Sequence, residues 1–245
     1  MAWDTNKNGY TVIFATVLVI AVGTLLSVAA ISLEPFQREN ADLEKMQSIL
    51  RAIRVQVDRS DAAESYKEYI EKALVLDDSG NAVENPKTPA FHIDLATEMK
   101  KPLAAQGLPI FKAEKDGQTY YIMPLYGHGL WGPIWGYVSL DSDLNTVYGI
   151  TFDHASETPG LGAEITQPYF QNQYRSEKIF DDQGQFRGIT AVKGYRDANR
   201  DKKDDGEVDT ISGATITSNG VTAMIYDRLQ LYLPYFKKLK MRDHG

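Results

Sequence analysis

A run without any charged side chain extends from Tyr10 to Leu33, close to the start of this 245-residue chain. The run is apolar on every side rather than along one stripe, which is typical of a helix surrounded by lipid. At ~1.5 Å of rise per residue it reaches about 36 Å, more than the ~30 Å hydrocarbon core of a bilayer. We therefore predict a short tail over residues 1–9 and a membrane-spanning helix over residues 10–33.

A cleaved signal peptide is the alternative for this run, because Ser27-Val28-Ala29-Ala30 resembles a small-residue processing site. The run is longer than a usual signal core, and the region before it has only Lys7 and the N-terminus against Asp4. These features favour an uncleaved anchor. The weak charge asymmetry across the span leaves its orientation open.

The overall composition excludes several classes of protein. With 33 acidic and 26 basic residues the formal net charge is -7, and no basic stripe precedes the C-terminal end, so we expect no nucleic-acid partner. The chain has no cysteine, which excludes disulfides, thiolate zinc sites and Cys-ligated iron-sulfur clusters. Any redox cofactor is therefore held in another way.

After the apolar run the pattern changes to that of an α+β domain. Apolar residues at helical spacing predict a stalk helix within residues 34–57, and a second helix is predicted around residues 61–76. Turn residues at 77–81 and a surface loop at 86–89 follow. Strands are predicted from β-branched and aromatic residues at 119–123, 135–140, 147–152 and 186–192, with a hairpin joining the second and third. One N-terminal membrane helix and a mainly antiparallel sheet with flanking helices, in a domain of residues 58–245, is thus the expected architecture.

The segment from Asp209 to Gly220 is the most informative one for function. Small and hydroxyl-bearing residues there precede a helical pattern of apolar residues, and Ser218 or Asn219 is expected to cap that helix. Gly213 and Ala214 allow close approach of a ligand, and the free N–H groups of a helix start attract phosphate. A Ser/Thr-rich capping turn without any ligand is the alternative interpretation of the same pattern.

Two more segments are rich in glycine and suit contact with a flat ring. In Glu157-Thr158-Pro159-Gly160-Leu161-Gly162 the glycines let the backbone approach a ring that Leu161 covers, although an ordinary strand-to-helix turn has the same composition. In Tyr126–Gly136 we consider Trp131 either as a ring that stacks near the ligand or as part of the core.

These segments together resemble the covalent FMN domain of the C subunit in the sodium-translocating NADH:quinone oxidoreductase family, a domain shared with the G subunit of the Rnf complex. Residues 209–215 fit the flavinylation pattern Asp-x-x-(Ser/Ala)-Gly-Ala-(Thr/Ser), and Glu157 to Gly162 and the Gly-x-Gly-Leu-Trp segment resemble two further signatures. The Thr-Ser-Asn-Gly that follows the pattern favours the sodium-translocating family over the Rnf subunit.

The resemblance implies a role for each matching residue. Thr215 is the implied phosphoester attachment point of FMN, placed there by a separate flavin transferase, because a Thr hydroxyl alone is a weak nucleophile near neutral pH. The implied FMN-binding residues are Asp209, Ser212, Gly213, Ala214, Thr217, Glu157, Thr158, Gly160, Leu161, Gly162 and Trp131.

The same resemblance implies an electron-relay subunit among other membrane subunits of a complex that oxidises NADH, reduces a quinone and exports sodium. It also implies a bacterial inner membrane, with the flavin domain on the periplasmic side. A single-span sensor that binds a small ligand near Trp131 and Gly160 is the alternative from another class, and it predicts no covalent chromophore.

We predict no metal site. His128 and His154 lack partners at ligand spacing, and His154 is expected to be a hydrogen-bonded structural residue beside Glu157. The acidic stretch at 197–207 departs from the EF-hand calcium pattern and is expected to be a solvated loop. The basic residues at 237–242 are expected to contact lipid headgroups or a partner, or to favour the C-terminal end of the last helix.

Overall fold

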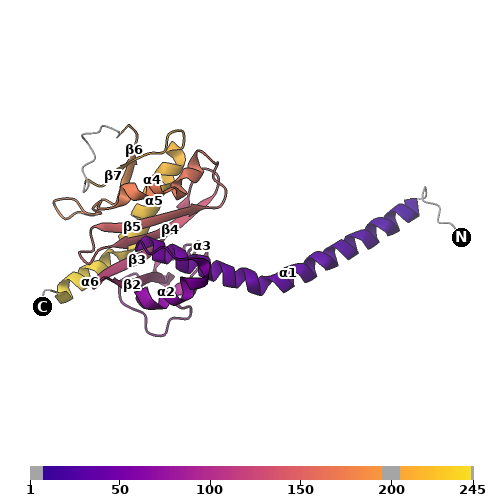
Figure 1. The fold of residues 1–245 in the computed structure, drawn as a ribbon, viewed down its shortest axis with the longest axis horizontal. Helices are drawn as coiled ribbons and strands as arrows, with labels where there is room; N and C mark the ends of the chain where they lie inside the picture. Colours follow the sequence, from indigo (N-terminus) through magenta and orange to yellow (C-terminus); the bar gives the residue numbers. More distant parts are fainter. Residues whose placement is uncertain (1–7, 195–204, 244–245) are drawn as a thin grey trace. The chain divides into compact units, whose positions relative to one another are not determined.

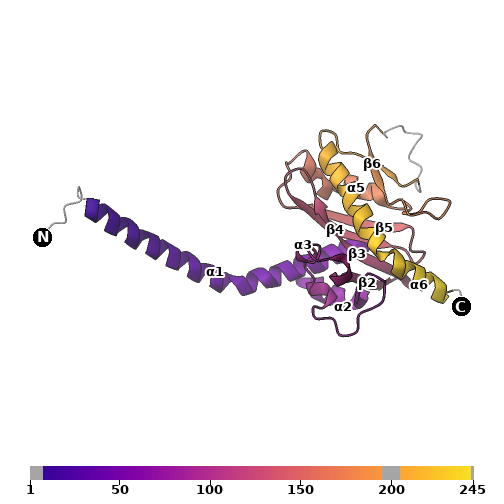
Figure 2. The ribbon, with the colours of Figure 1, turned by 180° about the vertical axis from the view of Figure 1, so that it is seen from behind.

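The computed structural model describes residues 8–194 and 205–243, so residues 197–204 of the predicted acidic loop lie outside the described part of the chain. The described residues form two compact units, which divide between Lys45 and Met46. Figures 1 and 2 show the chain from opposite sides.

The first unit consists of one apolar helix, the greater part of α1 (Asn8–Ala52). It contains a window with a mean hydropathy of 2.6, none of it buried, so this helix is long and apolar enough to cross a membrane. The sequence predicted a span followed by a separate stalk helix, but α1 continues through Pro35 without a break and ends at Ala52 rather than Val57. A proline inside a helix removes one i→i−4 hydrogen bond and crowds the carbonyl four residues earlier, and the turns on both sides of Pro35 keep this long helix continuous.

The second unit is built on a five-stranded antiparallel sheet with the order β1-β2-β3-β4-β5 and a separate pair of short parallel strands, β6 and β7. The strands are β1 (Ile70–Leu76), β2 (Leu108–Lys115), β3 (Gln118–His128), β4 (Pro133–Leu140), β5 (Val147–His154), β6 (Thr190–Val192) and β7 (Glu207–Asp209). The α-helices are α2 (Ala62–Tyr69), α3 (Leu95–Glu98), α4 (Pro168–Gln171), α5 (Thr215–Leu229) and α6 (Leu233–Asp243). The 3-10 turns are η1 (Arg59–Asp61), η2 (Ala90–His92), η3 (Leu103–Ala105), η4 (Gly162–Thr166), η5 (Asn172–Tyr174) and η6 (Gln230–Tyr232).

Both faces of the sheet are buried, because side chains alternate along β3 between two cores. Met123 and Leu125 belong to one core, which α5 and α6 cover, whereas Tyr120 and Ile122 belong to the other, which contains the end of α1. Figure 2 shows α5 and α6 crossing the sheet on the near side, and Figure 1 shows them behind it. The predicted α+β class with a mainly antiparallel sheet is confirmed.

Two local predictions were wrong. Residues 70–76 form β1 rather than the second half of a helix, since they pair antiparallel with β2, and Lys112 Nζ of β2 lies 2.6 Å from Glu71 Oε2 of β1. The strand predicted over residues 186–192 is confined to Thr190–Val192. The hairpin of β4 and β5 is confirmed.

Candidate functional site

Thr215 is the first residue of α5, and its side chain is exposed beside a pocket of about 650 Å³. The pocket is lined by Leu130, Lys193, Gly194, Asp209, Thr210, Ile211, Ser212, Gly213, Ala214, Thr215, Ile216 and Thr217. Ala214 occupies the N-cap position of α5 and makes no side-chain hydrogen bond. The first N–H groups of an α-helix have no partner within the helix, so an anion at Thr215 can accept hydrogen bonds from them.

The loop before α5 is held in place by Ser218, which is fully buried in the first turns of the helix. Its Oγ accepts a hydrogen bond from Ile211 N at 3.1 Å and donates to Ala214 O at 3.0 Å. The sequence predicted that Ser218 or Asn219 caps the helix, but the helix begins at Thr215. Ser218 therefore braces the loop from inside the helix and leaves the helix start open.

Gly213 provides the turn of this loop in a conformation that few other residues adopt, with φ +78°. A Cβ atom on Gly213 would lie 2.8 Å from Leu161 Cδ2, so the loop and the second glycine-rich segment are in close contact. The sequence placed both residues at the flavin, and the fold brings them side by side.

Glu157 connects all three segments that the sequence singled out. It is only 4% exposed, and its Oε1 accepts a hydrogen bond from Trp131 N at 2.7 Å. Its Oε2 accepts a hydrogen bond from the Thr217 hydroxyl, also at 2.7 Å. One buried carboxylate thus joins the segment after β3, the segment after β5 and the first turn of α5.

Glycines make room for this carboxylate. A Cβ on Gly162 would lie 2.1 Å from Glu157 Oε2 and 2.7 Å from Thr217 Oγ1, and a Cβ on Gly129 would lie 2.5 Å from Glu157 Oε1. No side chain fits at such distances. The glycines are therefore required for packing around Glu157 as well as for turns.

Thr217 is one of the implied FMN-binding residues; its hydroxyl donates to Glu157, and the residue is only 1% exposed. His154 has the structural role that was expected, since its Nδ1 accepts a hydrogen bond from Glu157 N at 3.2 Å. Asp209 lies at the end of β7, where its backbone N–H donates to Gln173 Oε1 at 2.8 Å.

Large apolar side chains in or next to the residues that line the pocket remain exposed. Trp131 is 65% exposed, Ile216 59%, Leu130 49% and Leu161 41%. Trp131 is therefore not a core residue, so of the two roles considered for its ring only contact with a ligand at the surface remains. Thr158 and Gly160 are also exposed, and Gly160 has φ +76° in the turn before Leu161.

The chemistry of the lining residues suits a ligand that carries both a phosphate and a flat aromatic ring. The open helix N-terminus and the Thr215 hydroxyl suit the phosphate, and the exposed apolar side chains suit a flat aromatic ring. Lys193 and Gly194 also line this pocket, although the sequence did not point to them. They follow β6, and no local pattern distinguishes them from any other loop residues.

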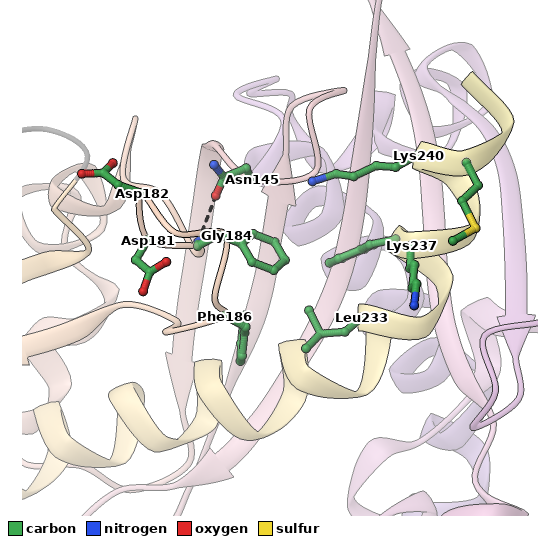
Figure 3. A pocket seen from close by; sticks show the side chains of 11 residues that line it. Asn145, Asp181, Asp182, Gly184, Phe186, Leu233, Lys237 and Lys240 are labelled. Carbon is green, nitrogen blue, oxygen red and sulfur yellow. Dashed lines mark hydrogen bonds between the residues drawn. The ribbon is translucent and has the colours of Figure 1, made fainter. Parts of the chain in front are cut away.

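A larger pocket of about 940 Å³ lies beside α6 (Figure 3). Its walls include Phe186 and Leu233, with Lys237 and Lys240 from the basic C-terminal region and Asp181 opposite (Figure 3). Asn145 Oδ1 accepts a hydrogen bond from Phe180 N at 2.9 Å in this pocket. None of its lining residues belongs to the three signature segments, so it is separate from the Thr215 site.

The fold and the site define an FMN-binding protein, and the family model described as "FMN-binding domain" matches residues 129–230. The C subunit of the Na(+)-translocating NADH-quinone reductase from Vibrio anguillarum is 34% identical over 232 residues, covering 89% of this chain and 88% of the relative. The corresponding protein from Neisseria meningitidis serogroup B is 31% identical, and the match covers 98% of both chains.

Solved structures agree with this assignment. The structure of the C subunit of the Na(+)-translocating NADH-quinone reductase from Parabacteroides distasonis is 43% identical, with a TM-score of 0.74 over 83% of this chain and 96% of that one. Shewanella oneidensis NqrC is 26% identical, with a TM-score of 0.69 over 82% of this chain and 99% of that one. The chain belongs to the family of Na(+)-translocating NADH-quinone reductase C subunits.

Proposed function

We propose that this chain is an electron-relay subunit of a sodium-exporting NADH:quinone oxidoreductase and that its FMN is joined through the phosphate to Thr215. The main support is the position of Thr215, an exposed hydroxyl at an uncapped helix start, in a pocket lined by the rest of the flavinylation pattern. Bound FMN supplies one- and two-electron redox chemistry. A covalent tether would prevent its loss during repeated transfers.

The residues of the chain would hold and orient this group. The first turn of α5 would donate hydrogen bonds to phosphate oxygens, and Gly213 would allow their close approach. Leu161 and Trp131 would cover the ring and exclude water from part of it. Glu157 is a positioning residue in this arrangement, because it fixes Trp131 and Thr217 relative to each other.

The maturation and the cellular setting are part of the proposal. A Thr hydroxyl alone is a weak nucleophile near neutral pH, which supports attachment by a separate flavin transferase. Residues 10–33 would anchor the chain in a bacterial inner membrane, the rest of α1 up to Ala52 would leave it as a continuation of the same helix, and residues 58–245 would lie on the periplasmic side. Other membrane subunits of the complex would exchange electrons with the FMN.

Similarity over most of the chain favours this function over the Rnf-type subunit, since the relatives named above are all C subunits of the sodium-translocating reductase. The ligand-sensing alternative predicts no covalent flavin. The Rnf-type subunit and the ligand-sensing domain would have the same fold as the proposed relay subunit, so the fold does not distinguish them. The covalent attachment of FMN and the electron relay therefore need separate tests.

Intact mass spectrometry tests the attachment. The chain co-expressed with a flavin transferase should be heavier by one FMN and yellow, and Thr215→Ala should lose both properties. Thr215→Ser is the matched control, because it keeps a hydroxyl at the same place and should still be modified. An unchanged mass of the wild-type chain would refute the covalent site.

Turnover of the assembled complex tests the relay. Complex that contains Thr215→Ala should lose NADH:quinone reductase activity while it retains all of its subunits. If the unmodified chain supports full turnover, the relay role is wrong even when the attachment is right.

A further inference from the structure

A second polar pocket, of about 320 Å³, lies where the end of α1 meets β5 and η5. Three arginine side chains line it, and no carboxylate does. The lining residues are Arg51, Arg54, Gln56, Gly149, Ile150, Thr151, Pro168, Gln171, Asn172 and Arg175. No residue of the proposed flavin site is among them.

The positive charges at this place are not balanced by ion pairs. Among the described residues Arg51, Arg54 and Arg175 take part in no salt bridge, and the Arg51 guanidinium donates only to Ser48 Oγ, at 2.7 Å. Asp58 and Asp61 share an adjoining hollow with Arg51 but do not line this pocket. In a chain with a net charge of -7, three arginines without an ion pair therefore line one pocket.

The end of α1 does not need these arginines for capping. Arg54 N donates to Arg51 O at 2.9 Å and Val55 N donates to Leu50 O at 3.0 Å, which is the pattern of a Schellman motif. Ser139 Oγ donates to Ala52 O at 2.5 Å. The last carbonyl groups of the helix therefore have donors already.

Lys115 makes a further contact just after the helix. Its Nζ donates to Ile53 O at 3.1 Å and lies 3.3 Å from the Tyr148 hydroxyl. The carbonyl groups at this helix end therefore do not need the guanidinium groups, which remain available for a ligand.

Arg54 occupies a position at which glycine is usual. It has φ 60°, in the left-handed region that is unfavourable for a residue with a side chain. Its guanidinium carbon lies 5.0 Å from the centre of the Tyr148 ring, a cation–π contact. A side chain at a strained backbone position of this kind is compatible with a functional use of its charge.

We propose that this pocket binds a phosphate-type oxyanion, through Arg51, Arg54 and Arg175. The planar guanidinium group matches phosphate geometry with two parallel hydrogen bonds, and several such groups together neutralise a dianion. Asn172 also lines the pocket, and its side-chain amide offers a further donor. A free phosphomonoester and the headgroup of an anionic phospholipid both present this chemistry.

Titration with inorganic phosphate tests the site on the full-length chain in a neutral detergent. Phosphate should raise the midpoint of thermal unfolding relative to chloride at equal ionic strength. Arg175→Gln should weaken phosphate binding about tenfold or more, since it removes charge-assisted hydrogen bonds. Arg54→Gly should weaken phosphate binding similarly. Because glycine suits the left-handed backbone at position 54, this variant should fold even if Arg175→Gln does not, and the test then remains decisive.

Lys237→Gln is the control, because it removes one positive charge outside the pocket and should leave phosphate binding unchanged. Micelles doped with phosphatidylglycerol or with phosphatidylcholine distinguish the two sources. A gain in stability only with phosphatidylglycerol, lost in Arg54→Gly, assigns the headgroup, and a response to inorganic phosphate alone assigns a soluble anion. No response to either, or an equal response in Arg54→Gly and the wild type, overturns the proposal.

Discussion

Replacement of Glu157 by alanine tests whether this residue holds the flavin site together. The substitution removes two hydrogen bonds to a charged, 4% exposed acceptor, from Trp131 N and from the Thr217 hydroxyl. At roughly 1.5–3 kcal/mol for each bond to a charged group, the loss is about 3–6 kcal/mol. The substitution also removes the cost of burying a carboxylate away from water, and this gain offsets part of the loss. We therefore expect the free energy of unfolding to fall by ~2–4 kcal/mol.

Glu157→Gln should be much milder, because an amide can accept the hydrogen bond from Trp131 N and donate one to Thr217 Oγ1. Its expected cost is about 1 kcal/mol. The control is Glu84→Ala, which removes an exposed carboxylate and should change little. Urea unfolding of the full-length chain in a neutral detergent, followed by tryptophan fluorescence, measures all three.

The same variants separate stability from maturation. Under conditions where Glu157→Ala is still folded, we expect a lower fraction of FMN-carrying chains in intact mass spectra, because the start of α5 loses its contact with the other two segments. If alanine is tolerated within about 0.5 kcal/mol, or if glutamine is as harmful as alanine, Glu157 does not organise the site.

Packing around Glu157 and the burial of a tyrosine give two more predictions. Gly162→Ala places a Cβ 2.1 Å from Glu157 Oε2, so it should lower the free energy of unfolding in urea by ~1–3 kcal/mol. In a chain that already carries Glu157→Ala the same substitution should cost less, and strictly additive effects of the two substitutions would contradict this contact. Burial raises the pKa of Tyr232 from 10.0 to about 12, so the unfolded chain loses this proton first and stability falls as the pH rises from 10 to 12. In unfolding curves measured between pH 10 and 12, Tyr232→Phe should remove about 2–3 kcal/mol of this loss of stability. The variant also loses the hydrogen bond to Pro109 O, which lowers its stability at every pH. An unchanged pH dependence would contradict the prediction.

The sequence by itself determined the parts that depend on local chemistry. The uncharged run of residues 10–33 indicated a helix that can cross a membrane, and the β-branched segments indicated β4 and β5 with their hairpin. The small-residue loop pointed to Thr215, because the flavinylation pattern and the helix start that follows it are both contiguous in the sequence. The Asp116-Gly117 dipeptide is itself typical of a two-residue hairpin turn, and both residues have positive φ where they join β2 to β3.

Only the tertiary structure decided what depends on partners distant in the sequence. Residues 70–76 became β1 because pairing with β2 outweighs local helical spacing. Ser218 was directed to the loop instead of capping the helix, and Thr217 was directed to Glu157. A buried carboxylate needs donors from wherever the fold supplies them, and no spacing along the chain shows that Trp131, Glu157 and Thr217 meet at one point.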